Sequence, residues 1–245
     1  MTNSLKTLAL TGAAITLIAA GGMKIDNTTR PADQVARDGD RKPAAMLAFA
    51  KIAPGQTVVD LLPGGGYFTR LIAQSVGANG KVVALVPDQY AKAFPKARTD
   101  IEALAAEPAY SNVTAAIRSI TEIGAPASLD RVFTAQNYHD LKSKNVPAAT
   151  TGAVNRAVFA ALKPGGMYVI LDHSAAAGSG LRDVDTLHRI DAAVVKAEVT
   201  SVGFKYAGES RVLANKADDR TKNVFDPAIR GKSDQFVYRF MKPKK

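Results

Sequence analysis

Histidine, the side chain best suited to acid–base chemistry near neutral pH, is rare in this sequence. The 245 residues contain no cysteine, which excludes disulfides, thiolate metal sites and cysteine nucleophiles. The chain has three histidines, so imidazole chemistry has three places: His139, His173 and His188. His139 is flanked by Tyr138 and Asp140. His173 follows Asp172, a carboxylate that can orient an imidazole.

A glycine-rich turn is the second feature that can bind a ligand. Residues 60–66, which we call the glycine turn, read Asp-Leu-Leu-Pro-Gly-Gly-Gly and end the apolar run that begins at residue 57. Glycines accept a positive φ and let the backbone approach a ligand closely. No Gly-Lys-Ser/Thr follows, and the spacing differs from G-x-G-x-x-G, so neither a Walker loop nor the dinucleotide pattern is present. A tight turn without a ligand is the alternative interpretation.

Strands and helices alternate along most of the chain. Short apolar runs predict strands, and longer amphipathic stretches predict the helices between them. The predicted strands are residues 57–62, 81–86, 112–120, 130–135, 167–171, 204–213 and 235–241. The predicted helices are residues 44–52, 67–76, 88–107 with an interruption at Pro95, 151–162 and 182–202.

This order predicts one α/β domain, a single doubly wound, mostly parallel sheet of about seven strands with helices on both faces. The last two strands have no helix between them, so the last strand is expected to pair antiparallel. In such sheets, ligands bind beyond the carboxyl ends of the strands. The glycine turn follows the first strand, His139 follows the fourth, and His173 ends the fifth. We therefore expect all three features at one edge of the sheet.

The first 22 residues are expected to lie outside this domain. Lys6 precedes an uncharged run, residues 7–22, that is rich in alanine and leucine and ends in small residues. This is the pattern of a secretory signal peptide, and the run is shorter than the roughly 20 residues that a spanning helix needs. We predict residues 1–22 to be a signal peptide or N-terminal anchor and residues 23–245 to be the folded domain. The protein is then exported, either periplasmic or anchored to the membrane.

Positive charge gathers towards the C-terminus. The net charge is +10, and residues 201–245 hold eleven lysines and arginines against five acidic residues. A solvated basic face near an anionic membrane surface is the interpretation that this pattern favours. A nucleic-acid partner is not expected, because no recognised nucleic-acid motif is present and few aromatic residues are interleaved with the basic ones.

Three segments together resemble class I S-adenosylmethionine-dependent methyltransferases. Residues 58–73 (VVDLLPGGGYFTRLIA) look like their first motif, residues 129–141 (LDRVFTAQNYHDL) like the fourth strand and the segment after it, and residues 161–173 (ALKPGGMYVILDH) like the turn before the fifth. More narrowly, RKPAAMLAF, PGGGY, NYHD and VFDPAIRGKSDQF resemble a bacterial subgroup of predicted methyltransferases that often carry a leader. The resemblance covers about residues 40–243. It implies methyl transfer from S-adenosylmethionine to an acceptor that we expect to be a small molecule.

The resemblance also implies a cofactor site at the glycine turn. Asp60 and the glycine backbone would face the amino-acid end of S-adenosylmethionine, while Leu62 stands where the motif usually has its first glycine. The usual acids after the second and third strands are missing or shifted, so the nucleoside contacts are assigned to Asp88 and to Ser119, with Glu122 as the alternative to Ser119. The full set of expected cofactor-binding residues is Asp60, Pro63, Gly64, Gly65, Gly66, Asp88, Ser119 and Asn137.

Methyl transfer to a hydroxyl acceptor needs a general base beside an acceptor held in line with the methyl group. The resemblance makes His139 the first candidate for this base, with Tyr138 and Asp140 beside it, and His173 the second. The polar stretch 218–232 is a candidate lid over the substrate, and a solvated connection is the alternative.

Two other hypotheses stay open. An exported binding or scaffold protein on the same fold would not use the cofactor, which is made in the cytoplasm, and fold alone does not fix function. A metal-dependent, hydrolase-like site is the second, because nitrogen and oxygen donors gather in this part of the chain: His139, Asp140, Asp172, His173 and His188. We assign no metal ligands from the sequence, because it does not show whether three of these donors converge.

Overall fold

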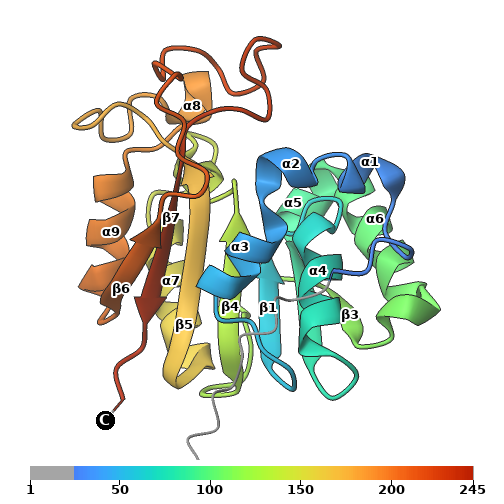
Figure 1. The fold of residues 1–245 in the computed structure, drawn as a ribbon. Helices are drawn as coiled ribbons and strands as arrows, with labels where there is room; N and C mark the ends of the chain where they lie inside the picture. Colours follow the sequence, from blue (N-terminus) through green and yellow to red (C-terminus); the bar gives the residue numbers. More distant parts are fainter. Residues whose placement is uncertain (1–24, 245) are drawn as a thin grey trace, which may run out of the picture.

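A seven-stranded sheet forms the centre of the fold, with helices packed on both of its faces (Figure 1). The structure is a computed structural model in which residues 25–244 are described. The expected leader, residues 1–22, lies outside the described residues. Between residues 25 and 244, no helix combines the length and the apolar character that crossing a membrane requires.

The strands follow the predicted order and confirm the predicted fold class. They are β1 (Thr57–Leu61), β2 (Lys81–Pro87), β3 (Val113–Arg118), β4 (Leu129–Ala135), β5 (Leu162–His173), β6 (Lys205–Ser210) and β7 (Gln235–Met241). In space they lie in the order β3-β2-β1-β4-β5-β7-β6. Neighbouring strands are parallel from β3 through β2, β1 and β4 to β5. Strand β7 lies between β5 and β6 and runs antiparallel to both.

The helices also agree with most of the sequence prediction. They are α1 (Ala32–Val35), α2 (Asp38–Arg41), α3 (Pro43–Phe49), α4 (Tyr67–Val76), α5 (Asp88–Ala93), α6 (Pro95–Ala106), α7 (Thr150–Ala161), α8 (Val184–Leu187) and α9 (Ala192–Ser201), with short 3-10 turns η1 (Pro108–Tyr110) and η2 (His139–Lys142). Pro95 separates α5 from α6, because proline is accepted at the start of a helix and not inside it.

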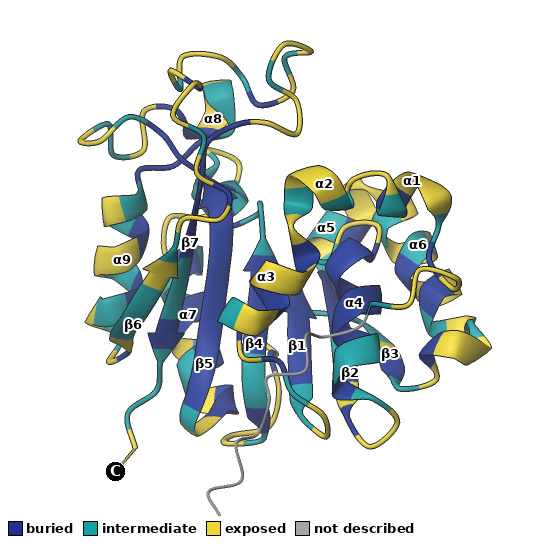
Figure 2. Cartoon of the chain, in the orientation of Figure 1, coloured by how far each residue is buried: buried dark blue, intermediate teal, exposed yellow. Residues whose placement is uncertain are grey.

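Both faces of the sheet are buried, because successive side chains of a strand point to opposite faces. In β1, Val58 joins the core on one face and Val59 the core on the other; in β5, Val169 and Ile170 divide in the same way. Helices α3, α4 and α6 cover the first face, and α7 and α9 cover the second. Figure 2 shows the strands mostly buried and the outer sides of the helices exposed. Strands covered on both faces have continuous apolar runs, which makes them recognisable in the sequence.

The predicted helix at residues 182–202 is wrong in one respect, since the structure divides it into α8 and α9. His188 ends α8 with a left-handed φ of 53°, and the side chain of Asp191 caps the start of α9. Between them, the buried guanidinium of Arg189 pairs with Asp218 at 2.8 Å. A buried charge needs such a partner, so this ion pair fixes the break against the polar segment before β7.

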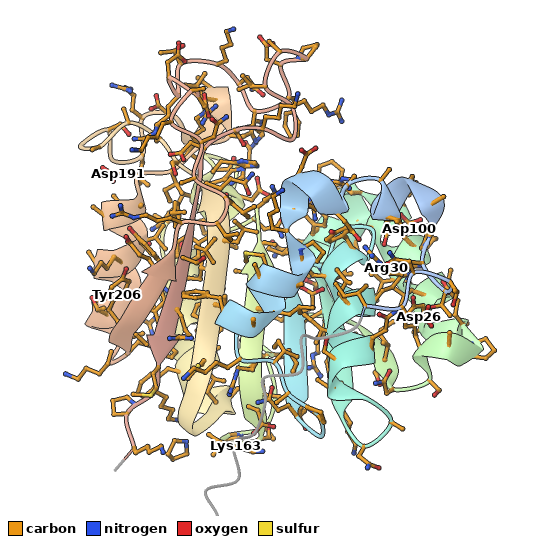
Figure 3. The ribbon with its side chains drawn as sticks, viewed as in Figure 1. Asp26, Arg30, Asp100, Lys163, Asp191 and Tyr206 are labelled. Carbon is orange, nitrogen blue, oxygen red and sulfur yellow. The ribbon has the colours of Figure 1, made fainter. Side chains whose placement is uncertain are left out.

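The polar segment before β7 and helix α8 stand above one edge of the sheet (Figure 1). Lys163, near the start of β5, lies at the opposite edge (Figure 3). The upper edge is therefore the one where the parallel strands end. Ligands of doubly wound sheets bind at this edge.

Candidate functional site

A cavity of about 700 Å³ lies at the carboxyl ends of β1, β4 and β5. One wall comes from the glycine turn, and another from the residues that follow β4 and end β5. Residues of α1 and α2 form a third wall. His188, at the end of α8, and Phe225, in the segment before β7, also line the cavity. The expected meeting of the glycine turn, His139 and His173 at one cavity is therefore confirmed.

The glycine turn is strained at Leu62, the residue before Pro63. Leu62 has a φ of 58°, a left-handed conformation that costs an L-residue about 1–2 kcal/mol. A glycine would adopt it freely, but Leu62 buries its side chain in the core. The side-chain amide of Asn137 donates to the carbonyls of Leu62 and Ala135, each at 2.7 Å. Asn137, expected to bind the cofactor, thus lines the cavity and also holds the strained turn in place.

The three glycines of the turn play different parts. A Cβ atom at Gly64 would meet nothing within 4 Å, and one at Gly65 would meet only Asp100 Oδ2 at 3.8 Å, so the space over these two residues is open. Gly66 has a φ of 78°, and its Cβ would lie 2.4 Å from a methyl group of Leu104 in α6. Pro63, Gly64 and Gly65 line the cavity, whereas Gly66 is needed for packing between α4 and α6.

Asp60, the first residue of the glycine turn, lies buried near the end of β1 and also lines the cavity. The hydroxyl of Thr69 donates to its carboxylate at 2.6 Å. Burial raises the pKa of Asp60 to about 7, although the hydrogen bond from Thr69 and the charge of Arg41 oppose this rise. The protonation of Asp60 therefore changes close to neutral pH.

Two arginines beside α2 bring positive charge to the cavity, and sequence reasoning missed them. Arg37 and Arg41 both line it. Arg41 donates to the side-chain oxygen of Gln136 at 2.7 Å, and its guanidinium lies 4.6 Å from the ring centre of Tyr67. Burial, followed by the charge of Arg37, lowers the pKa of Arg41 to about 10, so Arg41 is a cation at neutral pH. Their spacing of four residues was the available signal, since it puts two side chains on one helical face.

The segment that carries these arginines is fixed over the glycine turn. The amide of Gln34 in α1 donates to the carbonyl of Gly65 at 3.0 Å. Arg30 holds Asp38 with two hydrogen bonds of 2.7 Å, and the hydroxyl of Tyr67 donates to the same carboxylate at 2.6 Å. Figure 3 shows Arg30 and Asp100 on the side of the molecule formed by α1, α4 and α6.

A buried imidazole–carboxylate pair forms the opposite wall. Asp172, fully buried at the end of β5, accepts the backbone N–H of His139 at 2.8 Å, and its other oxygen lies 2.8 Å from His139 Nδ1. Burial lowers the pKa of His139, but the charge and hydrogen bond of Asp172, with the charge of Asp140, outweigh burial and raise it to about 9. The same pairing holds the pKa of Asp172 below its ordinary value in spite of burial.

His173, the second candidate base, lines the cavity in a different state. Its Nδ1 lies 2.7 Å from the hydroxyl of Ser233, in the segment before β7. Burial lowers the pKa of His173 to about 4, although the charge of Asp172 opposes this change. His173 is therefore a neutral imidazole at the pH at which His139 carries a proton.

Tyr138 does not reach the cavity, which corrects its expected place beside the base. Its ring is fully buried in the core under α7 and α9. Its hydroxyl accepts the amide of Asn155 at 2.8 Å and donates to Glu198 at 3.0 Å. Because Tyr138 stands between two cavity-lining residues, its side chain points to the other side of the chain and supports the helices there.

Asp88 and Ser119, expected to contact the nucleoside, line a separate hollow of about 300 Å³ and not the main cavity. This hollow lies between the ends of β2 and β3 and the start of α7. The side chain of Asp88, in the first turn of α5, accepts the backbone N–H of Gln89 at 2.8 Å. In the main cavity, the segment after β2 contributes Tyr90 and Phe94, whose ring centres are 4.7 Å apart.

Three of the five nitrogen and oxygen donors named from the sequence converge. One donor atom from each of His139, Asp140 and His188 lies within 4.8 Å of the other two. The two oxygens of Asp172 already accept the three hydrogen bonds of the neighbouring histidine residues. Phe225, from the candidate lid, lies with its ring centre 5.0 Å from that of His188.

Comparison with solved structures establishes the shared fold. A SAM-dependent methyltransferase from Aquifex aeolicus has a TM-score of 0.59 and 16% identity, covering 84% of this chain and 98% of that one. The [4+2]-cyclase SpnF has a TM-score of 0.61 and 14% identity, covering 84% and 81%. A possible exported protein from Bordetella parapertussis has a TM-score of 0.57 and 15% identity, covering 85% and 68%. No family model and no curated protein matches the sequence.

The raised pKa of Asp60 predicts a pH dependence of stability. Asp60 has a pKa of about 7 in the folded chain and 3.8 as its ordinary value, so the folded state binds more protons between these values. Stability is therefore expected to fall as the pH rises from about 4 to about 7. Asp60→Asn, which stays neutral, removes this loss. Urea unfolding of both proteins across this range measures it, and parallel pH profiles would contradict the assignment.

Proposed function

We propose that the chain binds S-adenosylmethionine and transfers its methyl group to a small-molecule acceptor. One observation carries this proposal: a single cavity joins an open glycine turn at the end of β1 to an imidazole–carboxylate pair at the ends of β4 and β5. The similarity of the fold to that of the Aquifex aeolicus methyltransferase supports the choice of cofactor. When bound, S-adenosylmethionine supplies a methyl group on a positively charged sulfur.

The residues of the cavity fit the cofactor at both ends. A volume of about 700 Å³ is within the range of roughly 300–1,000 Å³ that small-molecule sites have. The open backbone at Gly64 and Gly65 and the carboxylate of Asp60 suit the amino-acid end, and the guanidinium of Arg41 suits its carboxylate. The rings of Tyr90 and Phe94 give the nucleoside an aromatic surface, in place of the acid usual after the second strand.

His139 is the residue that we propose to receive the proton of a hydroxyl acceptor. Its pKa of about 9 keeps it protonated at neutral pH, so it acts as a base in its neutral form, which alkaline pH favours. Its Nδ1 is held by Asp172, so its Nε2 is the nitrogen left to face the cavity. Asp172 fixes the orientation of the ring and stabilises the imidazolium that forms. Asp140 and His173 border the same space, and His173, as a neutral imidazole, supplies polarity without charge.

An exported binding protein that does not use the cofactor is the second candidate. The separation of Asp88 and Ser119 from the main cavity favours it, because a site that loses its ribose-binding partners loses affinity steeply. The cyclase that has the same fold illustrates that the fold hosts other reactions. Direct measurement of cofactor binding separates the two candidates.

Titration calorimetry with S-adenosylmethionine and S-adenosylhomocysteine tests the proposed function. Gly65→Leu adds a side chain over the open part of the turn, where its Cβ meets no atom closer than 3.8 Å, so the fold tolerates it. The new side chain would overlap the ligand. A steric cost of about 3 kcal/mol would weaken binding roughly a hundredfold. Gly39→Leu, at an open position outside the cavity, is the control. Absence of binding by the unaltered chain at millimolar ligand would overturn the proposal.

Turnover tests the role of His139. An acceptor is first identified by screening small molecules for release of S-adenosylhomocysteine. Because general base catalysis contributes about 10²–10⁴-fold, His139→Ala is expected to lose turnover by that factor. Binding of S-adenosylmethionine, measured by calorimetry on the same variant, serves as the control and is expected to persist. Wild-type turnover in His139→Ala would exclude it as the base.

We also propose that residues 1–22 direct export and leave residues 23–245 as the working domain, either free in the periplasm or anchored. The solved structure of a possible exported protein with this fold supports the proposal. In an anchored chain, the basic residues of 201–245 would be attracted to the anionic membrane surface. Cell fractionation with sequencing of the mature N-terminus is expected to find the chain outside the cytoplasm, and a cytoplasmic chain that keeps Met1 would contradict export.

A further inference from the structure

We propose that His139, Asp140 and His188 form a binding site for one divalent first-row transition-metal ion at the acceptor side of the cavity. One donor atom from each side chain lies within 4.8 Å of the other two, which is close enough for a single ion to contact all three. Two imidazoles and one carboxylate with open positions form the ligand set that non-haem iron sites use, and imidazole also suits zinc, nickel and copper. This proposal goes beyond the methyltransferase function and does not depend on it.

The three ligands come from two parts of the chain that the fold brings together. His139 and Asp140 begin η2, which three residues (136–138) separate from the end of β4, and His188 ends α8. The ring centres of His139 and His188 are 5.5 Å apart, with the rings nearly perpendicular. His188 has a left-handed φ of 53°, a strained conformation for a non-glycine residue that often occurs at functional sites. The buried Arg189–Asp218 ion pair next to it fixes this conformation.

The surroundings of His139 match those of a metal-bound histidine. A histidine that ligates a metal usually gives its other ring nitrogen to a carboxylate, which fixes its orientation and makes it a better ligand. His139 Nδ1 lies 2.8 Å from the fully buried Asp172 Oδ1. The free Nε2 lies 3.3 Å from Asp140 Oδ1, the second proposed ligand. The ligand atoms of His139 and Asp140 therefore face one another.

His173 is close to this group but does not belong to it. Its Nδ1 is held by Ser233 at 2.7 Å, and its ring centre lies 6.1 Å from that of His139. Among residues 25–244, no second group of three histidine or acidic side chains has donor atoms this close together. The chain has three histidines, so His173 is the imidazole left outside this group and is a natural control.

The position of the ion defines a substrate class, and this step rests on the proposed function. Three protein ligands leave coordination positions open, and all three residues line the cavity. An acceptor with a hydroxyl oxygen could occupy such a position, where the ion would lower the pKa of that hydroxyl and let its proton pass to solvent. With the ion bound, Nε2 of His139 is a ligand and the ion would activate the acceptor, whereas in the chain without the ion the same nitrogen receives the proton.

Calorimetric titration of the full chain with Zn²⁺ alone tests the site. We expect one ion to bind per chain. His188→Ala and Asp140→Asn are each expected to weaken binding at least tenfold, because each removes one ligand. Two matched controls are expected to keep the affinity of the unaltered chain: His173→Gln, a cavity imidazole outside the group, and Asp100→Asn, a cavity carboxylate outside it.

A second variant guards against a change in folding. His188→Asn keeps a residue type that accepts the left-handed backbone, and Zn²⁺ is expected to raise the Tm of the unaltered chain but not that of this variant. Absence of saturable binding, or equal affinity in His188→Ala and the unaltered chain, would overturn the proposal. A chain that binds Zn²⁺ but not S-adenosylmethionine would overturn only the methyltransferase function, and the reverse result only the metal site.

Discussion

The carboxylate of Asp172 is the interaction around which one side of the site is built. It is fully buried at the end of β5, where an unpaired charge would cost several kcal/mol, and three hydrogen bonds satisfy it. Two of these bonds come from His139, directly after β4, and one from the backbone of His173. The need to satisfy one carboxylate thus ties the exit of β4 to the end of β5 and sets the direction of the imidazole that faces the cavity.

Strain is concentrated around the same cavity. Leu62 and Gln136 both have left-handed φ values, of 58° and 63°, although neither is glycine. Each follows a central strand, and each is held by hydrogen bonds: Leu62 by Asn137, and Gln136 by Arg41 and Gln235. Such conformations persist only where the surroundings fix them, and they are typical of binding sites. The walls formed by the glycine turn and by the residues after β4 therefore combine strained backbone with polar contacts that hold it.

The sequence predicted those parts of the fold and site that depend on neighbouring residues. Apolar runs and their turn residues identified all seven strands. The signal is strongest in central strands such as β1 and β5, which are buried on both faces and carry an unbroken apolar run. The position of the glycine turn and of His139 and His173 after successive parallel strands followed from topology. The break at His188 was not predictable, because the apolar spacing of residues 182–202 continues through it and the buried partner of Arg189 is remote in the chain. Arg41 was missed because its role depends on where a short polar helix packs.

By itself, the sequence determined the fold class, the edge of the sheet where a ligand binds, and the small set of side chains that can act there. These properties follow from periodicity and turn chemistry, which are local in the chain. Only the tertiary structure decided which of those side chains meet. Tyr138 turns towards α7 and α9, Asp88 and Ser119 face a separate hollow, and His188 joins His139 and Asp140. The reason is that a few buried charged groups, above all Asp172 and Arg189, fix the segments beyond the strands. The partners of these groups are remote in the chain, and only the packing of the fold brings them together.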